Sequence, residues 1–539
     1  MWATCDHGKN NDMTGEMKKV IFASAVGSVF EYYDFWVYVM MAPVLGPLFF
    51  QGDKVVQIVM VLSVITVTSV SRPIGGLIFG YVGDLWGRKL SFLITLVMMG
   101  IATFSIGLLP TYSTVGVKAP ILLVILRVLQ GLALGGEFIG ASIYIAEHVK
   151  FERRGFFSAI VLSTSGIGVS VTALVLFVTR SLIDDEAFNS WGWRLPFLLS
   201  FFVFLGSLLA RIKIKESPVF EKMVRESALS PSPIKESFST PKNLKLIFLA
   251  FICVMIGESG ITQSDYIIFL FLVNVLKVDM GIVDKMLICI YLLHVPILIY
   301  SGYLSDRFGR RAILLAAFLL TVLFYRPGFQ YLVQVSYPAY GRAIVENPIV
   351  IHYRPTTNCE FGVWEHFLLS TGKVGYKSFN TCQETVRWLG DNVINFSRDE
   401  LAAREYISVG NRLIELENRP SLVQALKDAK YMPDGRSVGM SFWKMVLISF
   451  VIMIPVSMVF GVCVAALLDM FPPRIRYTSV SFIYNMGHGL LGGLVPVIIM
   501  YNVFHFGSIY SATYYTVFVS LLGLLFSLFF YPKHCCRDD

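Results

Sequence analysis

The sequence is poor in charged residues, poor in cysteine and lacks the common motifs of enzymes. Charged residues make up 15% of the 539 residues, whereas an ordinary soluble domain has about 25%. A chain of this length could not cover its surface with so few charges, which excludes a soluble enzyme, a disordered scaffold and a nucleic-acid-binding module. Because 55% of the residues are hydrophobic, the expected solvent is lipid.

Several missing motifs exclude particular chemistries. The sequence has no Walker A motif, which excludes ATP as the energy source, and it has no HExxH and no paired CxxC motif. No Gly-x-Ser-x-Gly element follows an expected strand. Eight cysteines are too few for a disulfide scaffold of this size. Residues 1–19 lack the apolar core of a secretory signal, so we expect them to form a cytosolic tail.

Long apolar runs fill most of the chain. A helix needs about 20 mostly apolar residues to cross a bilayer, and the sequence contains twelve such candidate spans. They lie at about 20–45, 55–82, 90–109, 119–146, 156–179, 195–213, 245–274, 284–304, 312–332, 443–468, 478–501 and 508–531. The predicted fold is an all-α integral membrane protein with twelve transmembrane helices in two six-helix halves.

Two polar segments interrupt the helices. Residues 214–243 are rich in proline, serine and charge, so we expect a cytoplasmic linker between the N-terminal half, 20–213, and the C-terminal half. The second segment, 326–440, separates helices seven to nine, at 244–325, from helices ten to twelve, at 441–531. It is long enough for a small folded domain, and its stretch ELAAREYISVGNRLIELENRP has helical apolar spacing.

The ninth span needs more length than its apolar run supplies. Ala312 to Phe324 covers about 20 Å at 1.5 Å per residue, so part of 326–335 is expected to remain helical. Farther along, Cys359 and Cys382 are candidates for a disulfide if this segment faces an oxidising compartment.

The distribution of lysine and arginine predicts the orientation. Alternate loops are rich in basic residues, and such loops collect on the cytoplasmic side of a membrane. The basic loops are GDLWGRK (83–89), EHVKFERRG (147–155), 214–243, SDRFGRR (305–311) and PPRIRY (472–477). Both termini, including a second tail at 532–539, are therefore predicted to be cytoplasmic, and the 326–440 insert extracytoplasmic.

One of these basic loops occurs twice. The sequence GYVGDLWGRK at 80–89 matches GYLSDRFGRR at 302–311, and the two copies follow the second and the eighth span. Such a repeat is typical of secondary transporters, in which two halves enclose a site near the membrane midplane. The repeated residues could form a salt-bridge network that gates the inner side, or they could only signal topology. The gate candidates are Gly83, Asp84, Arg88, Asp306 and Arg310.

Ionisable residues inside the spans indicate function, because a central Asp, Lys or Arg costs about 2.5–3.5 kcal/mol on insertion scales. Glu31 and Asp34 in the first span are three residues apart and share a helix face. Two neighbouring carboxylates tend to hold one proton between them, which suits proton-coupled transport. We therefore expect Glu31 and Asp34 to carry the proton. Alternatively, one of them only pairs with an arginine on a neighbouring helix.

Spans two and four supply further polar candidates. Arg127 and Glu137 are ten residues apart, about 15 Å along a helix, and so cannot pair with each other. Arginine suits a carboxylate because its planar fork gives two parallel hydrogen bonds. Contact with a substrate and ion pairing with Glu31 or Asp34 both agree with the sequence. The cavity candidates from this half are Arg72, Arg127, Gln130 and Glu137.

In the second half, Glu258 and Asp265 of span seven are seven residues apart and hence on one face. Span seven is the counterpart of span one, so both are expected to line a shared cavity. Three further polar residues, expected more often to pack than to act, are His294, Asn485 and His488. Arg211, near the end of span six, is expected at the inner interface, where a lysine could replace it.

Motifs in both halves carry a resemblance to a known family. They are FEYYDF (30–35), RPIGGLIFGYVGDLWGRK (72–89), RVLQGLALGGEFIGASIYIAE (127–147), WGWRLPF (191–197), KESPVF (215–220), SDRFGRR (305–311) and FPPRIRYTSVSFIYNMG (471–487). With them the sequence resembles the major facilitator superfamily, in particular its metabolite:proton symporter branch and the proline/betaine transporters. The resemblance implies twelve helices that open alternately to each side. Ser28 and Tyr32 depart from the family's Asn and Trp, and Leu85 from its Arg.

The residues and the resemblance together imply a proton-coupled symporter of a small zwitterionic or anionic solute, betaine/proline-like or a carboxylate, in the inner membrane of a bacterium. It would need no cofactor besides the proton gradient, and no metal. Its partners would be the solute, protons and the lipid bilayer, without nucleic acid. Two alternatives stay open: a transporter-derived receptor that uses 326–440, and a drug:proton antiporter, although span five lacks that class's Gly-Pro-rich element. A membrane enzyme has no nucleophile or metal constellation to support it.

Overall fold

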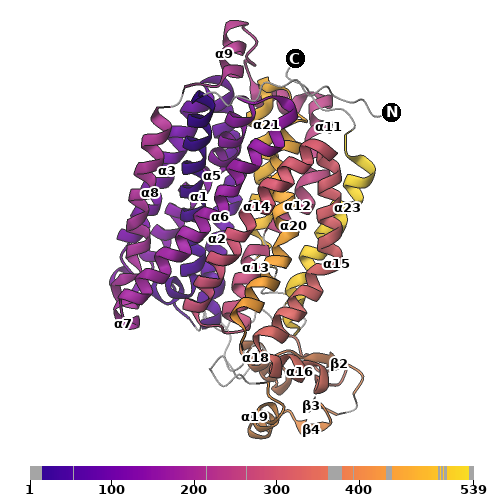
Figure 1. The fold of residues 1–539 in the computed structure, drawn as a ribbon. Coiled ribbons are helices and arrows are strands. Elements are labelled where there is room, and N and C mark those ends of the chain that lie inside the picture. Colours follow the sequence, from indigo (N-terminus) through magenta and orange to yellow (C-terminus); the bar gives the residue numbers. More distant parts are fainter. Residues whose placement is uncertain are drawn as a thin grey trace.

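The computed structural model describes residues 15–52, 54–213, 215–262, 264–361, 379–392, 394–402, 404–431, 440–495, 498, 502 and 507–532. The described part is a bundle of long helices with a small layer of helices and strands attached to one end (Figure 1). Of the two predicted tails, residues 1–14 and 533–539 lie outside the described residues. Residues 15–19 already belong to the first helix.

The first half of the bundle contains six long helices. They are α1 (Gly15–Phe49), α2 (Lys54–Leu85), α3 (Arg88–Leu108), α5 (Lys118–Ala146), α6 (Arg154–Leu182) and α8 (Arg194–Ile212). Short turns of helix connect some of them, namely α4 (Tyr112–Val115), η1 (Phe151–Arg153), α7 (Asp185–Ala187) and η2 (Phe188–Gly192).

The second half has less regular helices. Its seventh predicted span is a chain of short pieces: α11 (Pro241–Ala250), η3 (Phe251–Met255), α12 (Ile256–Thr262), α13 (Ser264–Leu270) and η4 (Phe271–Val275). The remaining elements are α14 (Met280–Phe308), α15 (Arg310–Ser336), α20 (Phe442–Leu468), α21 (Pro473–Asn485), η6 (Met486–Leu491), η7 (Ile509–Ser511) and α23 (Ala512–Phe530). The pieces η3, η4 and η6 are π-helical, and such irregular turns are frequent at functional sites.

Ten helices among the described residues are long and apolar enough to cross a membrane. Each lies at one of the twelve predicted spans. The other two predicted spans correspond to α1 and to α21 with η6, which pack against α6 and α2, respectively, inside the bundle. The predicted repeat also has a structural counterpart, because Gly87 and Gly309 precede α3 and α15 with φ of 112° and 88°. Residues with a side chain rarely adopt this backbone region.

The insert is not helical throughout. Its sheet has the order β2-β1-β3-β4, formed by β1 (Ile349–His352), β2 (Ser397–Asp399), β3 (Tyr406–Val409) and β4 (Arg412–Glu415). β1 is parallel to β2 and antiparallel to β3. The helical expectation for residues 400–420 was therefore wrong: a tight turn at Gly410, with φ of 56°, pairs Val409 with Arg412. The glycine turn favours a hairpin over a helix.

Three helices accompany the sheet in the described part of the insert. They are α16 (Pro338–Glu346), α18 (Thr381–Asp391) and α19 (Arg419–Asp428), and α16 packs against α15 of the bundle. Helix α15 continues through residue 326 to Ser336 in spite of Pro327, so the expectation of helix in 326–335 is confirmed and the separate layer begins only after Ser336. The insert also contacts the bundle directly, because the Phe396 amide donates to the Gly507 carbonyl at 2.8 Å.

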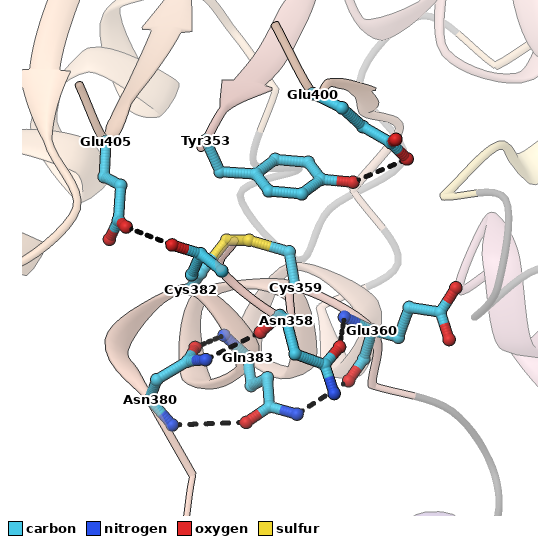
Figure 2. Close-up of a disulfide and its surroundings, with 10 residues drawn as sticks. Tyr353, Asn358, Cys359, Glu360, Asn380, Cys382, Gln383, Glu400 and Glu405 are labelled. Atoms are coloured by element: carbon cyan, nitrogen blue, oxygen red, sulfur yellow. Dashed lines mark hydrogen bonds between the residues drawn. A yellow bond between two sulfur atoms is a disulfide. The ribbon is translucent and has the colours of Figure 1, made fainter. Parts of the chain in front are cut away.

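The disulfide candidates are joined in the structure. Cys359 and Cys382 form a disulfide with their Cα atoms 5.2 Å apart. Figure 2 shows hydrogen bonds on both sides of it, including Asn380 Nδ2 to the Asn358 carbonyl at 2.6 Å and Gln383 Nε2 to the Glu360 carbonyl at 3.0 Å. The disulfide thus ties the segment after β1 to the start of α18.

The predicted linker contains two short helices, α9 (Pro218–Arg225) and α10 (Pro233–Ser239). Each begins with a proline, which fits the first helical turn because no amide hydrogen is needed there. Helix α9 projects from the end of the bundle opposite to the insert (Figure 1). The gate candidates also lie at that opposite end, since α15 runs from Arg310 to the insert.

Candidate functional site

A cavity lies between the two halves of the bundle. Its empty volume is about 670 Å³, and this figure includes space that is open to solvent. The first half contributes Glu31, Tyr32, Phe35, Trp36, Arg72, Leu134, Phe138, Ser165 and Val169. The second half contributes Thr262, Tyr291, His294, Val456, Phe460, Tyr484 and His488. Ligand cavities typically combine such an apolar wall with a few convergent polar groups.

The charged groups of the wall come from the first half. Glu31 on α1 is 4% exposed and Arg72 on α2 is 7% exposed. Glu31 lies within electrostatic range of Arg72 and also of Glu137 and Arg211. Among the described residues Arg72 does not form the expected ion pair with Glu31 or Asp34; its Nε donates to Asn485 Oδ1 of α21 at 3.2 Å. Arg72 therefore bridges the halves.

Aromatic rings from both halves form much of the wall. The Phe138 ring stacks on Tyr484 with centroids 4.9 Å apart and on Phe460 at 5.9 Å. Tyr32 meets the edges of Phe138 and Phe460 at 6.1 and 6.3 Å. Aromatic faces attract cations, and quaternary ammonium groups in particular. The cavity therefore offers a carboxyl group, a guanidinium and several aromatic faces to a small solute.

Asp34 lies behind this wall in a fully buried network. Its Oδ1 accepts a hydrogen bond from Gln130 Nε2 at 2.7 Å and another from the Thr103 hydroxyl. Arg127 Nη1 donates to Gln130 Oε1 at 2.8 Å, and its guanidinium lies 4.0 Å from the centroid of the Tyr38 ring. Gln130 thus connects Arg127 to Asp34 through two hydrogen bonds. Arg127 and Gln130, which were predicted from one motif, therefore belong to the same network as the first-span carboxylate.

Glu137 pairs with Arg211, which the sequence placed wrongly. Arg211 Nη1 lies 2.6 Å from Glu137 Oε1, and both side chains are fully buried. The guanidinium also lies 3.7 Å from the centroid of the Phe92 ring. A Cβ at Gly27 would lie 1.7 Å from Arg211 Nη2, so α1 leaves room for this side chain only by having glycine there. Arg211 is a buried partner of Glu137 and does not extend to an interface.

We expect Arg211→Lys to destabilise the protein, and Arg211→Ala to destabilise it more. Lysine keeps the charge but lacks the planar group that lies over Phe92 and fills the space beside Gly27. Alanine leaves the Glu137 carboxylate buried and unpaired, which typically costs about 3–5 kcal/mol. Thermal unfolding of the purified protein in detergent measures both effects. Arg225→Lys, on the exposed face of α9, is the matched control, and an Arg211→Lys protein as stable as that control would contradict the argument.

Glu258 of α12 contacts a histidine of the cavity wall, His488. His488 Nδ1 lies 3.2 Å from Glu258 Oε1, and its ring stacks on Tyr484 at 5.1 Å with an interplanar angle of 10°. His294, the other cavity histidine, shares a 2.6 Å hydrogen bond with Ser457. The side chain of Asp265 lies outside the described residues, so its predicted place in the cavity stays a prediction.

The first copy of the repeat forms an ion network at the end opposite to the insert. Arg88 Nη1 lies 2.7 Å from Asp84 Oδ1 and Nη2 donates to the Pro473 carbonyl at 3.1 Å. Asp84 Oδ2 accepts from the amide and the hydroxyl of Thr478, at 2.9 and 2.7 Å. Gly83 is required beside them because a Cβ there would lie 2.1 Å from the Tyr477 ring. The pair thus holds α21 of the other half.

The second copy repeats this arrangement in the opposite direction. Arg310 Nη1 lies 2.5 Å from Asp306 Oδ1, and Arg310 Nε lies 3.2 Å from Asp469 Oδ2. Asp306 accepts from the amides of Gly155 and Phe156 at 2.9 and 2.8 Å. These amides lie at the start of α6, where a helix has no carbonyl partners for them. A carboxylate of each half therefore binds a helix of the other half.

Four further charged residues complete the two networks, and the sequence did not single them out: Glu147, Arg154 and Arg476 lie in the basic loops at 147–155 and 472–477, and Asp469 lies in no motif. Arg88 Nη2 lies 3.5 Å from Glu147 Oε1, which also has Arg476 Nη1 at 4.0 Å. In the second network, Arg154 Nη1 lies 3.6 Å from Asp469 Oδ1. Glu147 and Asp469 end the corresponding helices α5 and α20. The equivalence of those two helix ends was the signal that could have identified them.

The linker also takes part in the first network. Glu216 Oε1 accepts from the Arg88 amide at 3.0 Å, and Glu216 Oε2 from the Lys89 amide at 3.2 Å. A carboxylate at the start of α3 is favourable because the first amides of a helix are unpaired and carry partial positive charge. Ser217 donates to Glu147. The KESPVF motif therefore fixes the linker to the gate candidates.

The described residues contain no group of three His, Cys, Asp or Glu that could hold a metal ion. The titratable residues of the site make pairs and networks with one another.

Comparisons with known proteins identify the family and the fold of the chain. Residues 24–341 match the family model described as Major Facilitator Superfamily. The Proline/betaine transporter of Escherichia coli K12 is 36% identical over 325 residues, which cover 57% of this chain and 64% of that protein. The glycine betaine/proline/ectoine/pipecolic acid transporter of Dickeya dadantii is 40% identical over 213 residues, covering 39% and 42%. The chain thus matches less than two thirds of the length of these relatives.

Solved structures with the same fold extend the match over the whole bundle. The xylose transporter XylE of E. coli, in a partially occluded inward-open conformation, has a TM-score of 0.59 at 15% identity, and the match covers 96% of this chain and 98% of that one. The human organic anion transporter MFSD10 has a TM-score of 0.53 at 14% identity, covering 95% and 100%. At these identities the likeness concerns the fold, which confirms the predicted fold class of the bundle.

Proposed function

The chain belongs to the major facilitator superfamily, and on that premise we propose that it is a proton-coupled symporter of a small zwitterionic or anionic organic solute. The observation that carries the proposal is the cavity between the halves, with Glu31 and Arg72 in its wall among aromatic rings. A zwitterion presents both charges to such a wall. The named substrates of two relatives, proline, betaine, ectoine and pipecolic acid, belong to this class of solute.

Alternating access would use the two ion networks as the inner gate. Asp84 and Asp306 each bind backbone amides of the opposite half, so these contacts must break before the halves separate at that end. Buried charges without partners are costly. Water that enters between the separating halves would solvate the charges that lose their partners. The network could therefore break and form again in each transport cycle.

Proton coupling is assigned to the first span. Glu31 reaches the cavity, and Asp34 lies behind it in the hydrogen-bond network with Gln130. Arg127 reaches that network through the same glutamine. The remaining candidates, Glu137 and Glu258, are each paired with a basic side chain, Arg211 and His488. Protons and the solute are the only partners this scheme requires besides the bilayer, and it uses no cofactor.

The protein is a multi-pass membrane protein by its family and its ten candidate spans. We place it in the inner membrane of a bacterium, with both termini and the linker in the cytoplasm and the insert outside. The basic loops at the end opposite to the insert support this orientation. The disulfide in the insert supports it too, because disulfides persist in oxidising compartments.

Reconstitution tests the proposed function. Purified protein in vesicles is given an inward proton gradient and offered labelled glycine betaine, proline, a dicarboxylate and an aromatic acid in turn. We expect gradient-dependent accumulation of at least one solute and its collapse when a protonophore is added. Binding without any accumulation across the whole panel would instead favour the alternative of a transporter-derived receptor.

We expect that the insert is not needed for transport. Replacing residues 337–440 by a short glycine-serine link should leave uptake within about a factor of a few of the full chain, because closing a longer or shorter surface loop changes the free energy little. The link would join the end of α15 to the start of α20. These two helices are in close contact, because a Cβ at Gly328 of α15 would lie 2.7 Å from Ile452 of α20. Vesicle uptake of the shortened protein is the measurement.

Two controls belong to this deletion. Thiol labelling from outside the cell should reach a cysteine at Val345 of α16, which is 74% exposed, and should not reach one at Val224 of α9, which is 49% exposed. The reverse labelling pattern would refute the orientation. A shortened protein that inserts normally and has no uptake would refute the dispensable role and favour a receptor or regulatory role for the insert.

A further inference from the structure

We propose that His488 of the second half and Arg72 of the first half together bind the carboxylate of the solute, so that this carboxylate bridges the two halves. The inference rests on the proposed function and specifies the substrate class of that site as carboxylates. His488 is the specificity-determining residue, and Glu258 and Asn485 are positioning residues. The sequence assigned His488 to packing, and its partners in the structure give it a different role.

The two side chains converge on one stretch of helix. Arg72 Nε donates to Asn485 Oδ1 at 3.2 Å. A Cβ at Gly489 would lie 3.2 Å from the Arg72 Cβ, so the side chain leaves α2 directly against η6. Asn485 and His488 are three residues apart and neighbours on the helix surface. Arg72 and His488 both line the cavity. They are therefore adjacent polar groups at the seam between the halves.

Asn485 is itself fixed, which gives Arg72 a defined direction. Its Nδ2 donates to the Gly135 carbonyl and to the Ser481 carbonyl, each at 2.7 Å. The amide oxygen is thereby oriented toward Arg72. Only Nε of the guanidinium is used in this hydrogen bond. The two terminal nitrogens of an arginine form the planar fork that suits a carboxylate.

The imidazole of His488 is held equally firmly. Its Nδ1 lies 3.2 Å from Glu258 Oε1, and its ring stacks on Tyr484 at 5.1 Å. When Glu258 is ionised, its carboxylate only accepts hydrogen bonds, and Nδ1 is then the donor of this pair. The Thr262 hydroxyl near Nδ1, at 3.4 Å, donates to the Glu258 carbonyl at 2.9 Å. These contacts use Nδ1 and not Nε2, and His488 lines the cavity.

Nε2 can donate to a carboxylate only when the ring carries its second proton. His488 is therefore the imidazolium while the carboxylate is bound, and the proton that the gradient drives stays assigned to Glu31 and Asp34. The charged and titratable groups around the ring are Glu258 of α12, Tyr484 of α21, Arg72 of α2 and, across the cavity, Glu31 of α1. Arg72 opposes a second positive charge nearby, and the solute carboxylate between them offsets this repulsion. A bound carboxylate thereby contacts both halves and favours the conformation in which they are closed around it.

Two substitutions at His488 separate donation from protonation. His488→Asn retains an amide that can replace Nδ1 toward Glu258 but has nothing at the position of Nε2. His488→Gln places an amide N–H near the Nε2 position, and this donor does not titrate. The matched control is His352→Asn on β1 of the insert, outside the cavity, whose Nδ1 likewise lies against a carboxylate, Asp399 Oδ2, at 2.9 Å. The measurement is calorimetric binding to the purified full chain, with glycine betaine and proline against their carboxylate-free counterparts, choline and pyrrolidine.

We expect the wild type and His352→Asn to prefer the carboxylate solute. His488→Asn should lose about 10- to 100-fold of that preference, the range of one hydrogen bond to a charged group, while choline or pyrrolidine binds as before. His488→Gln should keep the preference but lose its dependence on pH. An unchanged preference in His488→Asn overturns the proposal, and so does a wild type without any preference for the carboxylate.

These outcomes are distinct from failure of the proposed function. If the wild type shows the preference and its loss in His488→Asn but accumulates nothing in vesicles, the carboxylate site stands and transport fails. If the wild type accumulates carboxylate solutes and His488→Asn keeps the preference, transport stands and the two-residue anchor fails.

Discussion

Asp34→Asn is expected to abolish proton-driven accumulation while solute exchange across the membrane continues. Asparagine has the size of aspartate, and its amide oxygen can accept the same hydrogen bonds, from Gln130 Nε2 at 2.7 Å and from Thr103. The packing around the fully buried residue should therefore persist. The amide cannot bind and release a proton, so the gradient can no longer drive uptake.

The measurement is uptake into vesicles with and without a proton gradient, together with exchange of labelled for unlabelled solute. We expect the variant to reach only the equilibrium distribution, with exchange reduced by less than about tenfold, or ~1.4 kcal/mol. Asp185→Asn on the exposed α7 turn is the matched control. The same test on Glu31→Gln shows which carboxylate couples. Full gradient-driven accumulation in Asp34→Asn would contradict its assignment.

The sequence predicted the bundle because a lipid-facing helix has a simple signature. Apolar runs long enough to span the bilayer recur, and their ends carry residues with a plain meaning: Gly87 and Gly309 turn the chain and Arg88 and Arg310 begin the next helix. The insert has no such signature. Its strands are short, and a turn at Gly410 joins β3 to β4. The apolar spacing of this segment also suits a helix, which led to the wrong assignment.

Within the site, the sequence predicted which residues are costly to bury but not their partners. Glu31, Asp34, Arg127 and Glu137 were identified from their place in apolar runs. A partner on another helix has no fixed separation in sequence, so the pairing of Glu137 with Arg211, 74 residues away, could not be derived. Arg211 lies near a helix end, where a basic residue normally extends to the interface. The three-dimensional packing of α1, α3, α5 and α8 decides otherwise.

The repeated motif also contains a glycine that allows close packing of the two halves. The first glycine of each copy lies where the two halves touch. A Cβ at Gly302 of α14 would lie 2.4 Å from the Ala159 Cβ and 2.5 Å from the Gly155 carbonyl oxygen of α6. At the equivalent position, a Cβ at Gly80 would lie 2.7 Å from the Thr478 Cα of α21. The halves can thus meet at the inner end only because both positions lack a side chain.

Gly302→Trp is therefore expected to prevent closure of the inner end and to stop uptake. The indole cannot fit between α14 and α6, where even a Cβ would lie 2.5 Å from the Gly155 carbonyl oxygen. Overpacking of this kind costs about 1–3 kcal/mol or more, which corresponds to a loss of about 10- to 100-fold in uptake. The Asp306 bonds to Gly155 and Phe156, at 2.9 and 2.8 Å, would be lost with the closed end. Gly206→Trp on α8 is the matched control, because a Cβ there meets nothing within 4 Å. Solute binding to the purified Gly302→Trp protein should persist, since the cavity lies farther along the helices. Normal vesicle uptake by Gly302→Trp, or an equal loss in Gly206→Trp, would show that the close contact of these glycines is not the inner gate.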